Sequence, residues 1–145
     1  MLGVMDGELN YNSPKSIAQF LRQNGMAPTR RFGQNFLISQ PVREKILGLL
    51  ELPGDGVVWE IGPGLGAMTH MLIDKTARIV LFEIDRRFIE FLSSLYAQRD
   101  DVRIVAGDVV KTWNEVYAAE GLPNRIMGNL PYNTASMIIG DLIEA

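Results

Sequence analysis

Three glycines and a downstream acidic residue are the first residues in this sequence with a recognisable chemistry. Gly62, Gly64 and Gly66 are spaced two apart and follow a short apolar run over residues 57–61. A buried parallel strand that enters a glycine turn and then a helix is typical of nucleotide-binding units, because glycine lets the backbone approach a ligand closely. Glu83 ends the next apolar run, where a carboxylate can accept both ribose hydroxyls of a nucleoside. The pattern predicts nucleoside binding and leaves open whether the ligand is a dinucleotide or S-adenosylmethionine.

Two more polar residues follow predicted strands. Asp108 comes shortly after the apolar run 102–106, and Asn129 comes directly after 125–128. Because ligands of open α/β sheets bind at the carboxyl ends of the strands, these residues are expected beside the glycine turn and Glu83. Asp108 can accept a hydrogen bond from an exocyclic adenine amine, and the alternative is that it only caps the loop that follows.

The segment Asn129-Leu130-Pro131-Tyr132 is the most specific element of the sequence. It suits the transfer of a methyl group to an exocyclic base amine, which is a poor nucleophile because its lone pair is delocalised into the ring. The Asn129 side-chain oxygen and the Leu130 carbonyl can accept hydrogen bonds from the two N–H groups of the amine. These bonds would turn the nitrogen lone pair toward the methyl group. Pro131 stiffens the backbone, and Tyr132 offers a flat face for stacking a base. Catalysis at such a site is positioning plus electrostatics.

These motifs together resemble the ribosomal RNA adenine N6,N6-dimethyltransferases, the kasugamycin-sensitivity methyltransferases. The resemblance covers about residues 13–145 and rests on the motifs at 32–37, 60–66, 83–85, 107–108 and 128–132. It implies S-adenosylmethionine as the methyl donor and two adjacent adenosines near the 3′ end of small-subunit rRNA as the substrate. The related large-subunit enzymes share the plan, but the Gly-Pro-Gly-Leu-Gly and Asn-Leu-Pro-Tyr wording favours the small-subunit branch.

The same resemblance implies roles for single residues. Asn35 and Leu37 would close over the methionine part of the cofactor, and Gly62 would contact it through the backbone. The two acidic residues named above would take the ribose and the adenine amine, and Asn129 would sit between the cofactor and the target amine. Arg30 and Arg31, in the loop before Asn35, are candidates for RNA binding.

Composition sets the broad class of the protein. The 145 residues are enough for one domain with one core, and 47% hydrophobic and 21% charged residues are ordinary for a globular protein. The net charge of −3 is uneven, because residues 1–50 carry six Lys and Arg against three Asp and Glu. A local basic patch can steer a phosphate backbone, although a solvated helix face explains it equally well. Without cysteine there are no disulfides or thiolate metal sites.

The remaining expectations concern setting and partners. No apolar run approaches the length of a membrane span, and the first ten residues do not form a secretory signal. We therefore expect a cytoplasmic protein that contacts no membrane. The resemblance further implies a monomer that uses no metal and has ribosomal RNA or the precursor of the small ribosomal subunit as its partner.

The chain order predicts a Rossmann-like α/β methyltransferase fold. Residues 1–12 are predicted to be disordered, and Ser13-Pro14 begins a helix that Gly25 closes. Ser39 or Gln40 is predicted to cap a second helix, with Val42, Ile46, Leu47 and Leu50 inward, and a third helix runs from the glycine turn to about Lys75. Predicted strands lie at 57–61, 79–83, 102–106 and 125–128, with helices after each and a spatial order of 3-2-1-4.

The sequence stops inside the helix predicted after the fourth strand. Members of the resembled family continue with three more strands and a helical RNA-binding domain, so we expect residues 13–145 to be the N-terminal part of the catalytic domain, with reduced or no activity. Two other readings remain open. One is a nicotinamide-dependent oxidoreductase, which leaves the Asn129 motif unexplained, and the other is a ribosome-assembly or RNA-binding module without turnover.

Overall fold

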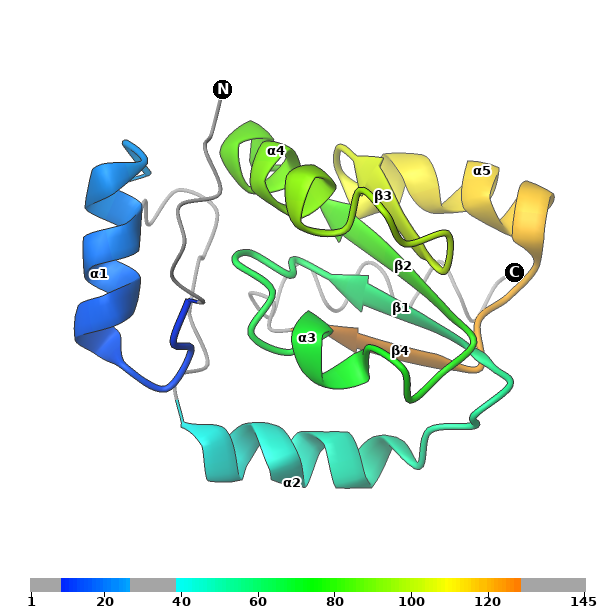
Figure 1. Cartoon of the computed structure of the whole chain (residues 1–145). Helices are drawn as coiled ribbons and strands as arrows, with labels where there is room; N and C mark the ends of the chain where they lie inside the picture. The colour runs from blue at the N-terminus through cyan, green and yellow to red at the C-terminus, as the bar shows by residue number, and fades with distance from the viewer. Residues whose placement is uncertain (1–8, 27–38, 129–145) are drawn as a thin grey trace.

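A computed structural model describes residues 9–26 and 39–128, which contain five helices and a four-stranded sheet. The elements in chain order are α1 (Pro14–Gln23), α2 (Gln40–Leu50), β1 (Val57–Ile61), α3 (Thr69–Leu72), β2 (Arg78–Glu83), α4 (Arg86–Leu95), β3 (Val102–Ala106), α5 (Val109–Glu120) and β4 (Arg125–Gly128). All neighbouring strands pair in parallel, in the predicted order β3-β2-β1-β4. The carboxyl ends of the strands therefore meet at one edge, on the side where α1 stands in Figure 1.

The helices divide between the two faces of the sheet as right-handed crossovers require. One apolar cluster joins β1 and β2 to α3 and α4 through residues such as Val58, Leu81, Leu72 and Leu92. The opposite face packs on α5, because the chain reverses direction across the sheet between β3 and β4. This reversal places the topological switch point between β1 and β4, where open α/β sheets bind their ligands.

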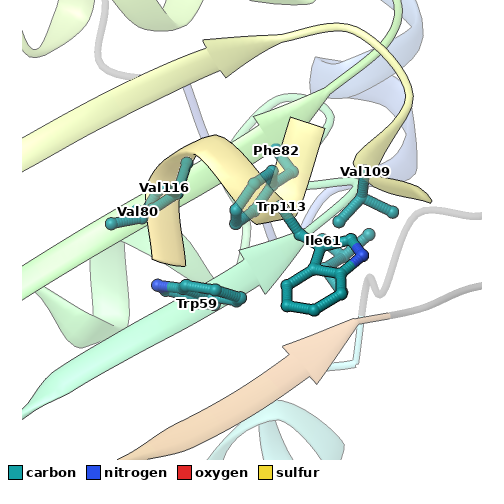
Figure 2. Packing of buried hydrophobic residues seen from close by; sticks show 7 residues of the cluster. All are labelled: Trp59, Ile61, Val80, Phe82, Val109, Trp113 and Val116. Atoms are coloured by element: carbon teal, nitrogen blue, oxygen red, sulfur yellow. The ribbon is translucent and has the colours of Figure 1, made fainter. Parts of the chain in front are cut away.

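The α5 face of the sheet is built around two tryptophans. Trp59 and Phe82 meet edge to face with ring centroids 5.1 Å apart, and Trp113 of α5 covers them together with Val109 and Val116. Figure 2 shows these side chains between the two strands and the helix. Burial of these aromatic side chains packs β1 and β2 against α5.

The structure confirms most of the predicted elements. The strands at 57–61, 102–106 and 125–128 have the predicted bounds, and the second begins one residue earlier at Arg78. Ser13 caps α1 by accepting from the Ser16 N–H at 3.1 Å, and Gly25 follows the helix with a φ of +63°.

Two helix predictions are wrong. The third helix ends at Leu72 instead of Lys75, because Asp74 adopts a left-handed φ of +63° and the Thr76 hydroxyl donates to the Gly56 carbonyl at 2.7 Å. On α2 the predicted inward residue Val42 is 45% exposed, and the adjacent Arg43 is buried instead.

The N-terminal segment also differs from expectation. Residues 1–8 lie outside the described part of the chain, but residues 9–12, predicted to be disordered with them, make defined contacts. Leu9 and Tyr11 pack against a cluster formed by α1, Leu65 and Phe88. Hydrophobic burial of these two side chains gives this short segment a fixed place that its polar composition does not indicate.

Candidate functional site

The glycine turn connects β1 to α3 at the switch point of the sheet. Gly62, Gly64 and Gly66 all have positive φ, at +69°, +59° and +87°, a conformation that residues with a Cβ rarely adopt. The Gly66 N–H closes the turn on the Pro63 carbonyl at 2.9 Å, and the Gly62 N–H donates to the Phe82 carbonyl at 2.8 Å. Since the Gly62 N–H is engaged with β2, a ligand contact at Gly62 must use its carbonyl or Cα.

Glu83 ties the end of β2 to the glycine turn. Its Oε1 accepts from the Gly64 N–H at 2.9 Å, and its Oε2 accepts from the N–H groups of Ile84 and Asp85 at 2.8 and 3.1 Å. Burial raises the pKa of this carboxyl, and the three N–H donors oppose that rise. Glu83 therefore lies beside the predicted glycines, as the sequence indicated, and already helps to shape their turn.

A second buried carboxyl, that of Glu60, was not selected from the sequence. It links the two elements that flank the glycine turn. Glu60 of β1 accepts from the Thr69 hydroxyl at 2.6 Å, which ties the strand before the turn to the helix after it. Burial raises the Glu60 pKa to about 7, and the hydrogen bond from Thr69 opposes part of that effect. The available signal was its place in a strand enclosed on both faces, where every residue points into packed protein.

Asp108 lies at the carboxyl end of β3 and caps α5. Its Oδ1 accepts from the Val110 N–H at 3.0 Å, the contact expected of a helix N-cap. The capping alternative for this residue is thus present in the structure, and it engages one of the two carboxylate oxygens.

An apolar residue lies beside these acids. Ile84 follows Glu83 and is 48% exposed at the ligand edge of the sheet, although β2 itself is almost wholly buried. An exposed apolar side chain at this edge suits a flat ring, so Ile84 joins the candidate site. Sequence reasoning passed over it because its neighbours Glu83 and Asp85 carried the recognisable chemistry.

Several predicted site residues lie outside the described residues: Arg30, Arg31, Asn35, Leu37, Asn129, Leu130, Pro131 and Tyr132. The helix predicted after Tyr132 lies outside them as well. The last described residue, Gly128, pairs with Ile61 immediately before the glycine turn. The strand that leads to the Asn129 motif therefore ends beside the turn.

One of the six basic residues counted in residues 1–50, Arg43, lies in the interior of the protein. Arg43 is buried, and its guanidinium donates to the Tyr11 carbonyl and the Asn12 side chain, so it cannot belong to a solvent-facing patch. Burial lowers its pKa. In residues 9–26 and 39–128, no helix is long and apolar enough to cross a membrane. The same ranges hold no cluster of three or more potential metal-ligating side chains.

Comparison with known proteins agrees with this geometry. The family model described as ribosomal RNA adenine dimethylase matches residues 27–145. A curated relative from Treponema denticola, named ribosomal RNA small subunit methyltransferase A, is 41% identical over 138 residues, which are 94% of this chain and 47% of that protein. The chain thus spans about half the length of the relatives that it matches.

Solved structures give the same result for the fold. A dimethyladenosine transferase from Plasmodium falciparum superposes with a TM-score of 0.63 at 25% identity, covering 74% of this chain and 38% of that one. The 23S rRNA methyltransferase ErmE gives a TM-score of 0.61 at 29% identity, covering 73% of this chain and 41% of its own. Both share the Rossmann-like arrangement seen here, and with a family model that matches most of its residues, the chain belongs to the ribosomal RNA adenine dimethylase family.

Proposed function

We propose that this chain binds S-adenosylmethionine and is the cofactor-binding part of an enzyme that dimethylates N6 of two adjacent adenosines near the 3′ end of small-subunit rRNA. The observation that carries the proposal is the joining of the glycine turn to Glu83 at the switch point of the sheet. Family membership and a relative named for the small ribosomal subunit support the choice of substrate.

The described residues fit the nucleoside part of this cofactor. Glu83 Oε1 holds the Gly64 N–H and, with two lone pairs, retains a second acceptor position for a ribose hydroxyl. Ile84 offers apolar surface next to it for the adenine ring. Asp108 uses Oδ1 to cap α5, so its other oxygen, Oδ2, would accept from the adenine amine. Gly62 would approach the cofactor through its carbonyl or Cα, while Asn35 and Leu37 would cover the methionine part.

The reaction needs little from the protein beyond placement. S-adenosylmethionine supplies a methyl group on a positively charged sulfur, which is already activated toward attack. The side-chain oxygen of Asn129 and the carbonyl of Leu130 would accept hydrogen bonds from the two N–H groups of the target amine. Pro131 would stiffen that backbone, and Tyr132 would stack on the base, so that the chain contributes positioning and electrostatics. Arg30 and Arg31 would contact the RNA backbone.

Calorimetry with three ligands tests the proposal. The chain should bind S-adenosylmethionine and S-adenosylhomocysteine and should not bind NAD, because the Asn129 motif and the Asn35 loop have no role with a dinucleotide. Selective binding of NAD would overturn the proposal. RNA binding without any binding of the methyl donor would favour the assembly-module alternative.

A Glu83→Ala variant tests the ribose assignment. Hydrogen bonds to a charged group contribute about 1.5–3 kcal/mol each, so cofactor affinity should fall by roughly 10- to 1,000-fold. Because Glu83 also holds the turn through the Gly64 N–H, the variant should lose stability by about 1–3 kcal/mol, and its binding must be measured under conditions where it remains folded. Glu90→Ala, which removes a carboxylate from the solvent face of α4, is the matched control and should change neither quantity. Unchanged affinity in Glu83→Ala would remove Glu83 from the site.

A further inference from the structure

The segment before α1 contacts the glycine turn through one side chain. The Tyr11 hydroxyl donates to the Leu65 carbonyl at 2.7 Å, across 54 residues of sequence. The same ring stacks on His70 of α3, with centroids 4.5 Å apart and an interplanar angle of 16°. Tyr11 thus touches both the turn and the helix that follows it.

The contact fixes one peptide unit of the turn from both sides. In the peptide that joins Leu65 to Gly66, the carbonyl accepts from Tyr11 and the N–H donates to the Pro63 carbonyl. Gly66 has a φ of +87°, and glycine restricts the rotation of a flanking peptide less than any other residue. The Tyr11 hydroxyl oxygen also lies close to Gly66 itself, since a Cβ added there would be 3.5 Å from it.

Tyr11 is itself held in place by α2. The guanidinium of the buried Arg43 donates to the Tyr11 carbonyl at 3.3 Å and to the Asn12 side chain. The Asn12 side chain also donates to the Gln40 side chain at 2.7 Å. These hydrogen bonds hold the backbone of residues 11 and 12 against α2. The Tyr11 hydroxyl is therefore a fixed donor that can hold the turn, and it does not simply move with the turn.

From these contacts we propose that Tyr11 is a positioning residue for cofactor binding: it holds the Leu65–Gly66 peptide in the orientation that shapes the glycine turn for the nucleoside. The inference rests on the proposed function, because the turn is taken to be the cofactor site. Without the hydroxyl, the carbonyl of the buried Leu65 loses its donor and the turn samples other peptide orientations, so that binding must select the competent one.

The test compares Tyr11→Phe with Tyr117→Phe. Both remove a single phenol oxygen, but Tyr117 lies half exposed on α5, on the opposite face of the sheet. S-adenosylhomocysteine affinity should fall by roughly 2- to 10-fold in Tyr11→Phe, the range of one net hydrogen bond, and should not change in Tyr117→Phe. Hydrogen exchange, measured without ligand, should quicken over residues 62–70 in Tyr11→Phe alone.

The two readouts separate this role from a merely structural one. If Tyr11→Phe lowers the melting temperature but leaves both the affinity of the folded protein and the exchange of residues 62–70 unchanged, the positioning role is overturned. Failure of the unsubstituted chain to bind S-adenosylhomocysteine would overturn the proposed function instead. In that case faster exchange of the turn in Tyr11→Phe would still support the hold of Tyr11 on the turn, and unchanged exchange would overturn it.

Discussion

The strands that carry the two parts of the proposed site differ in their support. β1 and β2 have paired strands on both sides and are almost wholly buried, and they carry the glycine turn and Glu83. β4, which leads to the Asn129 motif, has β1 as its one partner within the described residues, and its residues alternate between half-buried and exposed. In Figure 1 it lies at the margin of the sheet.

This difference separates two tasks within one fold. The part that would hold the cofactor is enclosed by its own neighbours and further secured by Tyr11, Glu60 and Glu83. The part that would orient the target amine follows β4, whose one strand partner among the described residues is β1. Since the relatives that this chain matches are about twice as long as it is, we expect cofactor binding and methyl transfer to respond very differently when a family-type C-terminal half is added.

The largest effect should be on methylation of RNA. We expect the 145-residue chain to transfer methyl groups to unmethylated small ribosomal subunits more than about 1,000-fold more slowly than a version extended by a family-type C-terminal half. A displacement of about 1 Å between reacting groups costs on the order of 100-fold in rate. The extension would also add phosphate contacts, which this chain, with its net charge of −3, is poorly suited to make. Labelled methyl incorporation measures both proteins, and comparable rates would refute the division of tasks.

Removing the same side chain from the two regions sharpens the comparison. Ile79 of β2 is 0% exposed and Ile126 of β4 is 37% exposed. Ile79→Ala should cost about 2–5 kcal/mol of unfolding free energy, because it leaves a cavity in packed core. Ile126→Ala should cost about 1 kcal/mol or less, since much of that side chain is already in solvent. Urea denaturation of each variant checks the pair, and equal losses would show that β4 is as firmly packed as β2.

How much of this could be read from the sequence depends on the range of the contacts involved. β3 and β4 were predicted to the residue because a short apolar run bounded by turn residues carries its own signal. The end of α3 was missed because a contact between Thr76 and Gly56 helps to set it. The burial of Arg43 and the fixed position of Tyr11 were missed because each depends on the other. The Arg43 guanidinium donates to the Tyr11 carbonyl across 32 residues of sequence, a contact that no local pattern indicates.

The site shows the same limit. Spacing correctly predicted that the glycines and Glu83 lie side by side, whereas the sequence could not show that Glu83 already holds the Gly64 N–H. The ligand roles of these residues and of Asp108 stay predictions. Asn129 to Tyr132, Asn35, Leu37, Arg30 and Arg31 remain predictions.

The support beneath the glycine turn should depend on pH. A carboxyl whose pKa rises from 4.5 to about 7 on folding, as for Glu60, costs the folded state about 3 kcal/mol once it is ionised. The stability contributed by its protonated form is complete below about pH 4.5 and is lost as pH rises through 7. Relative to wild type, Glu60→Gln should therefore gain stability between about pH 5.5 and pH 8, measured by urea denaturation. If the difference in unfolding free energy between Glu60→Gln and wild type did not change with pH, the raised pKa of Glu60 would be contradicted.

The smallest effect tests the two roles of Asp108. Serine is as good a helix N-cap as aspartate, so Asp108→Ser keeps the bond to the Val110 N–H and should change stability by less than about 0.5 kcal/mol. It removes the second carboxylate oxygen, and if that oxygen accepts the adenine amine, S-adenosylhomocysteine affinity should fall by roughly 5- to 20-fold. Asp85→Ser is the matched control, because Asp85 caps α4 in the same way but pairs its second oxygen with Arg87 at 2.6 Å.

The control should lower stability slightly and leave affinity unchanged. Because both substitutions preserve a cap and delete one oxygen, any difference in binding between them comes from the position of that oxygen and not from the stability of a helix. Equal affinities for Asp108→Ser and wild type would reduce Asp108 to a helix cap. The adenine would then be held by the surface of Ile84 and the backbone alone, which would confine the recognition of the cofactor to β1 and β2, the better supported of the two regions.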